Sequence, residues 1–101
     1  MKPEQDRTAI IQREMTITTD DFFRLLPKAL AGYEFRISDQ SIQVTIETGI
    51  VNIRLMQETT RKIGAFELPV IHITFYFENI PQDETQKFFD KFDLAYQKGG
   101  G

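Results

Sequence analysis

Five side chains carry groups suited to binding a ligand: Arg36, Arg54, Arg61, His72 and Tyr76. A guanidinium offers a forked set of donors that fits a carboxylate or a phosphate, so two arginines separated by one strand could clamp an anion. His72 is the only histidine, and a metal ion or general-base chemistry would require partner groups that the sequence does not place beside it. We therefore predict these five as binding residues, with no catalytic residue, metal ligand or cofactor.

The remaining reactive groups have structural explanations. Ser38 and Ser41 flank a predicted turn and have no base beside them. The acidic pairs Asp20-Asp21 and Asp83-Glu84 fall at predicted helix starts, where negative charge is favourable. No glycine-rich loop joins a strand to a helix, as a phosphate cradle would require. The sequence thus favours a protein that is not an enzyme, without excluding catalysis.

Length and composition predict one ordinary globular domain. The 101 residues can bury a core without disulfides, and 41% hydrophobic with 27% charged residues is typical of soluble proteins. A net charge of −3 argues against nucleic-acid binding. Neither a membrane-spanning stretch nor the apolar core of a signal peptide is present, so we expect a cytoplasmic protein without a membrane partner. We predict a flexible arm at residues 1–8 and a single domain at 9–101.

The first predicted elements are an edge strand and a helix. Alternating apolar residues indicate a strand from Gln12 to Thr18. Thr18, Thr19 and the following acidic pair predict a helix start, and Gly32 marks its end. Pro27 lies inside this pattern, so we expect a bent helix or two short pieces. Apolar residues recur at helical spacing at Phe22, Leu25, Leu26, Ala29 and Leu30.

Three strands follow, and their turns predict a register. If Asp39-Gln40 and Thr48-Gly49 are two-residue hairpin loops, every apolar residue falls on one face of an antiparallel meander. The predicted pairs are Ile37–Ile42, Phe35–Val44, Tyr33–Ile46, Ile46–Val51, Val44–Ile53 and Ile42–Leu55. On the other face, this register puts Arg36, Gln43 and Arg54 in one row.

The strongest strand signal is Leu68 to Glu78, which we expect near the centre of the sheet and antiparallel to the strand around Ile53. Its odd positions, from Ile71 to Phe77, belong to the core, and its even positions to the opposite face. The preceding segment, Gln57 to Glu67, predicts a wide turn with a bulge or flexible point at Gly64.

A second helix is predicted from Pro81 to Lys98 and Gly99. Its buried stripe would comprise Thr85, Phe88, Phe89, Phe92, Ala95 and Tyr96. The predicted order is therefore β-α-β-β-β-β-α, an α+β fold in two layers. This topology resembles TATA-binding-protein-like and helix-grip domains, in which a curved antiparallel sheet wraps around a long C-terminal helix. The resemblance implies a fold and no function.

The outer face of the predicted sheet retains apolar residues that the core does not need: Ile50, Met56, Val70 and Tyr76. We therefore expect a non-catalytic module that binds a protein partner or associates with itself through this face. The alternative is a site for an anionic or amphipathic small molecule, either between the sheet and the long helix or at Arg36 and Arg54. The Gly99-Gly100-Gly101 ending resembles the tail of ubiquitin-like carriers, but there the tail follows a strand and here a predicted helix.

Overall fold

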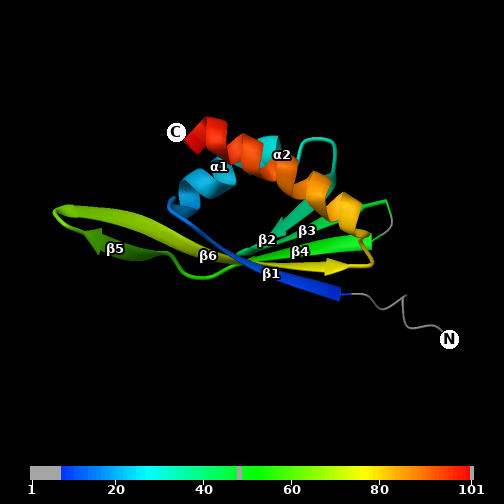
Figure 1. Cartoon of the computed structure of the whole chain (residues 1–101), viewed down its shortest axis with the longest axis horizontal. Coiled ribbons are helices and arrows are strands. Elements are labelled where there is room, and N and C mark those ends of the chain that lie inside the picture. The colour runs from blue at the N-terminus through cyan, green and yellow to red at the C-terminus, as the bar shows by residue number, and fades with distance from the viewer. Residues whose placement is uncertain (1–7, 48, 101) are drawn as a thin grey trace.

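The computed structural model describes residues 8–47 and 49–100, the last three without their side chains. They form an α+β domain whose two helices lie on one face of an antiparallel sheet (Figure 1). In chain order the elements are β1 (Thr8–Met15), α1 (Thr19–Ala29), β2 (Glu34–Ser38), β3 (Ser41–Ile46), β4 (Gly49–Leu55), β5 (Thr59–Ile63), β6 (Phe66–Glu78) and α2 (Gln82–Gly100). Of the flexible N-terminal segment predicted at residues 1–8, only Thr8 is among the described residues. Gly101, the last residue of the predicted glycine tail, also lies outside them.

The strand order is β1-β6-β4-β3-β2, with β5 paired to β6. The predicted edge position of the first strand and the central position of Leu68–Glu78 are confirmed. The first strand runs over Thr8–Met15, not from Gln12 to Thr18. Thr18 is instead the N-cap of α1, because its hydroxyl accepts a hydrogen bond from the backbone N–H of Asp21 at 3.1 Å.

One predicted hairpin register is confirmed and the next is wrong by two residues. Ile37 pairs with Ile42 and Phe35 with Val44, as predicted, whereas Tyr33 precedes β2. Between β3 and β4 the observed pairs are Ile42–Ile53, Val44–Val51 and Ile46–Gly49. The shift is even in number, so each side chain keeps its predicted face.

Gly49 belongs to β4 and not to the predicted turn, and its partner in that turn, Thr48, lies outside the described residues. A methyl group on Gly49 would lie 2.0 Å from the backbone oxygen of Glu78. This backbone contact admits only glycine, so the position of Gly49 depends on a strand that comes much later in the chain.

The predicted wide turn at Gln57–Glu67 is wrong, because this segment contains β5 and the start of β6. Leu55 faces Ile73 and Thr59 faces Val70, so three residues of one strand oppose two of β6 and form a bulge at 56–58. β4 and β5 therefore act as one bent strand along β6. Gly64, with φ +60°, begins the two-residue turn that joins β5 to β6.

We call the β5–β6 ribbon, residues 59–70, the arm. It projects from one end of the sheet beyond both helices (Figure 1). The molecule accordingly measures 56 × 24 × 24 Å. β5 is exposed along its whole length, whereas the helices cover the inner side of β3, β4 and most of β6.

The helices pack their apolar stripes against the odd positions of β6. α1 is a single helix with Pro27 inside it, which excludes the predicted split into two pieces. α2 begins after Pro81, whose carbonyl accepts a hydrogen bond from the N–H of Thr85 at 3.0 Å. The predicted stripe is buried at Phe88, Phe89, Phe92 and Tyr96 and half-buried at Thr85 and Ala95.

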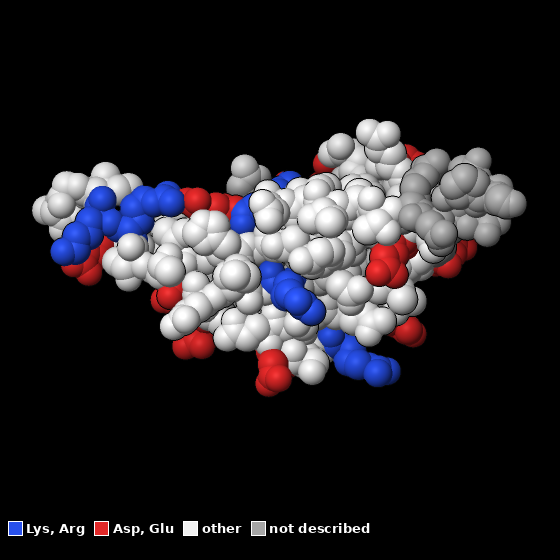
Figure 2. All heavy atoms as spheres, turned by 90° about the horizontal axis from the view of Figure 1, so that it is seen from below, with Lys and Arg blue, Asp and Glu red and all other residues white. Residues whose placement is uncertain are grey.

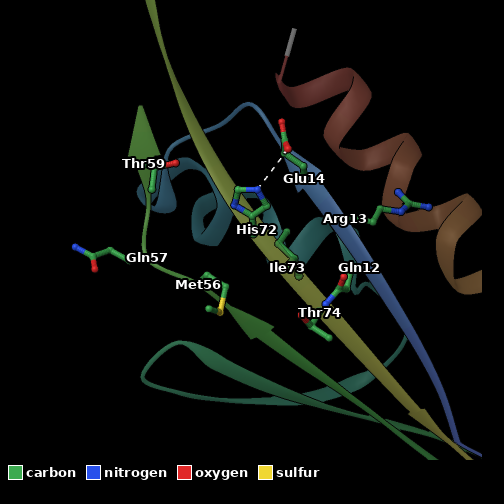
Figure 3. A pocket seen from close by; sticks show the side chains of 9 residues that line it. All are labelled: Gln12, Arg13, Glu14, Met56, Gln57, Thr59, His72, Ile73 and Thr74. Carbon is green, nitrogen blue, oxygen red and sulfur yellow. Dashed lines mark ion pairs between the residues drawn. The ribbon is translucent and has the colours of Figure 1, made fainter. Parts of the chain in front are cut away.

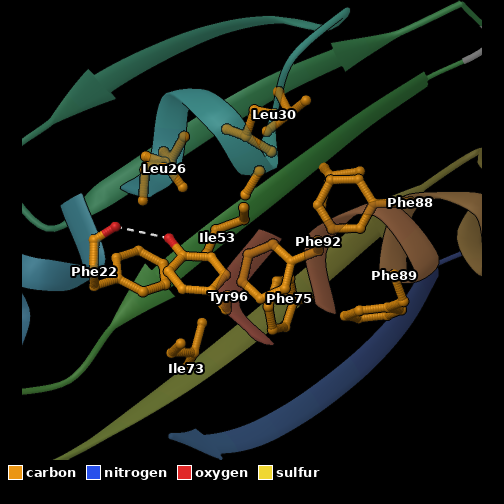
Figure 4. Packing of buried hydrophobic residues seen from close by; sticks show 14 of the residues in the cluster. Phe22, Leu26, Leu30, Ile53, Ile73, Phe75, Phe88, Phe89, Phe92 and Tyr96 are labelled. Atoms are coloured by element: carbon orange, nitrogen blue, oxygen red, sulfur yellow. Dashed lines mark hydrogen bonds between the residues drawn. The ribbon is translucent and has the colours of Figure 1, made fainter. Parts of the chain in front are cut away.

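Aromatic rings fill the space between sheet and helices (Figure 4). The ring centre of Phe75 lies 5.0 Å from that of Phe89 and 5.4 Å from that of Phe92, both edge to face. The Tyr96 hydroxyl donates a hydrogen bond to the Phe22 carbonyl at 2.7 Å, and burial raises the pKa of this phenol. The core is therefore dry, aromatic and tied across the two helices by one buried hydrogen bond.

Candidate interaction face

The face of the sheet opposite the helices, which we call the outer face, is uncovered (Figure 2). The strand registers place its side chains in rows that cross five strands. One row runs Ile10, Tyr76, Asn52, Gln43, Arg36, and the next runs Gln12, Thr74, Arg54, Ser41, Ser38. Most side chains of these two rows are polar but uncharged, and each row contains one arginine.

Exposed apolar side chains concentrate on the outer face. Among the described residues, six large apolar side chains are exposed. The strand registers place Ile10, Ile63 and Phe66 on the outer face, and Met56 lines a groove there with His72 and Thr74. Phe66, at the tip of the arm, is 71% exposed. Ile37 and Leu94 lie elsewhere, on the inner side of an edge strand and on α2. Ile50 and Tyr76 are half-buried on the outer face, and Val70 is buried there.

The predicted row of two arginines is not formed. The two-residue shift between β3 and β4 places Gln43 opposite Asn52, and Arg54 opposite Ser41. Arg36 lines a shallow hollow with Glu34 and Thr45, whereas Arg54 lines a separate hollow. The guanidinium groups thus lie in different rows, and Tyr76 shares the hollow of Arg54.

The structure brings His72 and Arg61 together through Glu14, a residue that sequence reasoning missed. Arg61 on β5 lies 2.5 Å from one Glu14 oxygen, and His72 on β6 lies 3.4 Å from the other. The hydrogen bond from Arg61 lowers the pKa of the Glu14 carboxyl, and the same contact raises the pKa of Arg61. The position of Glu14 follows from the pairing of β1 with β6, for which the local sequence carries no signal.

A groove of about 600 Å³ opens on the outer face where the arm joins the body (Figure 3). We call it the neck groove. It is lined by Gln12, Arg13, Glu14, Met56, Gln57, Thr59, His72, Ile73 and Thr74. Arg13 contributes its backbone, because its guanidinium pairs with Asp93 on α2 and lies 4.1 Å from the Phe89 ring centre. Met56 supplies an exposed thioether, so the groove combines an apolar patch with amide and hydroxyl groups.

Within residues 8–47 and 49–100, no three His, Asp or Glu side chains gather closely enough to hold a metal ion. No charged side chain is buried in residues 8–47 and 49–97. Glu14 lies between Arg61 and His72 in an accessible polar cluster. Such a cluster can fix the arm and can contact a partner.

A search for long apolar helices in the described part of the chain finds none that could cross a membrane. No protein-family model matches the chain, and no curated protein matches it either.

Proposed function

We propose that this protein is a non-catalytic binding or assembly module whose outer sheet face is covered by a protein surface. The observation that carries the proposal is the uneven distribution of exposed apolar side chains. The inner face is buried under two helices, yet Ile10, Met56, Ile63 and Phe66 are exposed along the opposite side, from β1 to the tip of the arm. Exposed apolar side chains that share one face of a sheet can mark an interaction site.

The polar residues of the outer face support the same proposal. Asn52, Gln43, Ser41 and Thr74 lie near its centre and are uncharged, and Arg54 lies among them. Removing an amide or hydroxyl from water costs far less than removing a charge, provided that the partner returns a hydrogen bond. Tyrosine and arginine are enriched at protein interfaces, and Tyr76 and Arg54 line one hollow near the centre of this face. The face is therefore suited to a partner that brings its own hydrogen-bonding groups.

The test is affinity capture with the purified chain, combined with light scattering to detect self-association. Tyr76→Glu places a charge at the centre of the outer face and should abolish capture of partners, including further copies. Leu94→Glu is the matched control, since it puts the same charge at an exposed apolar site on α2. A strictly monomeric chain whose Tyr76→Glu variant captures the same proteins as the wild type would overturn the proposal.

A small-molecule site is the alternative, and the neck groove is the feature that favours it. Its volume of about 600 Å³ falls within the range of ligand pockets. An anionic ligand is disfavoured there, because Arg61 is already engaged by Glu14. The space between sheet and helices is occupied by rings such as Phe75, Phe88 and Phe92. A thermal-shift panel of nucleotides, acyl chains and organic acids would detect such a ligand; no shift across the panel would remove this alternative.

We also propose that the fold is of the TATA-binding-protein-like or helix-grip type. The two-layer arrangement, the order β1-β6-β4-β3-β2 and the long C-terminal helix support this assignment. An experimental structure compared with both groups of folds would test it. A cytoplasmic location and the absence of nucleic-acid binding stay predictions, which fractionation and a salt-dependent binding assay would check.

A further inference from the structure

One outermost strand of the sheet, β2, has an edge that no other strand covers. In the described part of the chain its only neighbour is β3, so the other side of Glu34–Ser38 ends the sheet. Native sheets commonly protect such an edge with a lysine, a proline or a bulge, because unpaired backbone groups bind further strands. β2 contains neither lysine nor proline, and its register with β3 is continuous. The edge is therefore open to a further strand.

The backbone groups at this edge belong to Phe35 and Ile37. The N–H of Leu55 donates to the carbonyl of Gln40, just before β3, at 2.9 Å. The even residues of β3 therefore direct their backbone groups toward β4, and its odd residues toward β2. The β2 residues opposite these odd residues are Glu34, Arg36 and Ser38. Phe35 and Ile37 thus direct their N–H and C=O groups away from the sheet, where an added strand would bind them.

Two opposite charges lie on the outer face of β2, two residues apart. Glu34 and Arg36 are exposed, and neither forms an ion pair with another described residue. The other strands with a free side differ in their charges. In β1 the two charged side chains lie on opposite faces, and in β5 both are positive. The charge pattern of β2 is therefore the one that can pair with a copy of itself.

Antiparallel pairing of β2 with the β2 of a second copy brings these charges together. A two-fold axis perpendicular to the sheet at Phe35 places Glu34 of each copy opposite Arg36 of the other. Moving the axis by one residue would place Glu34 or Arg36 opposite itself, and moving it by two would leave both without an opposite charge. The two charges would occupy non-hydrogen-bonded positions, where opposed Cα atoms are about 4.5 Å apart. Charge thus favours a second copy in a single register.

The inner side of the same contact is apolar. This register puts Ile37 opposite Tyr33 of the second copy, on the side of the helices. Ile37 is 47% exposed in the single chain, although it does not lie on the outer face. Tyr33 is half-buried, and its N–H donates to the Leu30 carbonyl at 2.9 Å. Its carbonyl would then accept a hydrogen bond from the N–H of Ile37, and its ring would cover the Ile37 side chain.

We propose that two copies of this chain join their β2 strands in an antiparallel pair centred on Phe35, which continues the sheet from one copy into the other. The helices of both copies would lie on one side of the joined sheet, and both outer faces on the other. The contact uses an edge and not the outer face, so it goes beyond the proposed function and does not depend on it. A contact of one five-residue strand is small, so we expect a dimer that forms at high concentration and dissociates in a dilute capture experiment.

Charge reversal tests the contact by light scattering over a range of concentrations. Glu34→Arg and Arg36→Glu should each weaken the dimer roughly tenfold, because each sets like charges opposite one another on both sides of the axis. The double variant, Glu34→Arg with Arg36→Glu, should restore the dimer, since the pairs form again with their signs exchanged. Leu94→Glu, on α2, should leave the dimer unchanged. Equal dimerisation by the wild type and both single variants, or no dimer at any concentration reached, would overturn the proposal.

Disulfide trapping tests the register, since the chain contains no cysteine. Glu34→Cys mixed with Arg36→Cys and oxidised should give a species of twice the 11.8 kDa chain mass. The two cysteines would face each other at a distance that a disulfide spans, and the other charge pair would stay intact. Each variant alone should cross-link less, and Arg36→Cys mixed with Leu94→Cys measures random collision. Cross-linking no higher than in these controls would overturn the register.

Tyr76→Glu separates this contact from the proposed function. Tyr76 lies on β6, and β4 and β3 stand between it and β2, so this change should leave the dimer measured by light scattering unaltered. A dimer that persists in Tyr76→Glu and is weakened by Glu34→Arg supports the contact at β2, whether or not the outer face captures a partner. A dimer lost in Tyr76→Glu and unaffected by Glu34→Arg would assign self-association to the outer face and overturn the contact at β2.

Discussion

The two faces of β6 differ although one strand carries both. Ile71, Ile73, Phe75 and Phe77 alternate along it with His72, Thr74 and Tyr76. The first four are at most 1% exposed and contact the helices, whereas His72 is exposed and the other two are half-buried. The difference separates two environments on one strand: the odd positions are packed in the core, whereas the even positions lie on the accessible face.

The largest expected effect comes from the inner face. Phe75→Ala should lower the free energy of unfolding by about 3–5 kcal/mol, because the ring is fully buried and neighbouring rings close around it only in part. Thr74→Ala, on the next residue and the opposite face, should change it by less than about 0.5 kcal/mol. Urea denaturation of both variants checks this. Equal losses would show that the two faces are not energetically distinct.

A smaller effect is expected where β4 meets the end of β6. Gly49→Ala should cost about 1–3 kcal/mol, because the added methyl would lie 2.0 Å from the Glu78 oxygen and one strand must shift. Gly64→Ala is the comparison at the arm, where a methyl group would meet no atom within 4 Å and only the positive φ opposes it. Thermal unfolding should rank Gly49→Ala as the more destabilising of the two; the reverse order would contradict the close contact.

The buried hydrogen bond between the helices should contribute less. Tyr96→Phe keeps the ring but removes the hydroxyl that donates to the Phe22 carbonyl, and should cost about 1 kcal/mol. Tyr76→Phe, the corresponding change on the outer face, should cost nothing measurable in the isolated chain. Chemical denaturation of the two variants would sharpen the contrast between the faces, and a larger loss from Tyr76→Phe would contradict it.

The smallest effect concerns the ion pair at the neck. The Glu14 pKa is lowered from its ordinary value of 4.5 by Arg61, so the pair persists at neutral pH and is lost as the pH falls through the lowered pKa. Carboxyl NMR titration should therefore find Glu14 below 4.5 in the wild type and higher in Arg61→Gln. Lys62→Gln, on the other side of β5, should leave the titration unchanged. An unaltered titration in Arg61→Gln would show that the pair does not form in solution.

The parts of the fold that the sequence predicted are those with local signals. The cap at Thr18, the aromatic stripe of α2 and the β2–β3 turn each depend on residues close together in the chain. The β3–β4 register depends on Gly49 meeting Glu78, and alternation cannot reveal a shift of two residues, because both registers keep the same faces. That shift is also the reason why Arg36 and Arg54 do not share a row.

The arm and Glu14 escaped prediction for a related reason. Thr60, Arg61 and Lys62 have the polar composition of a turn, yet they form a strand because β6 is long enough to pair with them. Their side chains are polar because both faces of this two-stranded ribbon are exposed to solvent. Glu14 joins Arg61 and His72 only after β1 has been placed against β6, a pairing between distant segments. The candidate site therefore depends on long-range pairing, which a single sequence does not display.

The pairing of β1 with β6 also imposes an order in time. Thr8 lies opposite Glu78, so nearly the whole domain must leave the ribosome before the first strand acquires its neighbour. At the usual pace of synthesis this takes on the order of several seconds. During that interval the other hairpins can form from adjacent segments, while the edge of β6 that β1 will occupy stays empty. The strand made first thus cannot enter the sheet until β6 has been made, and the edge of β6 that it covers is open until then.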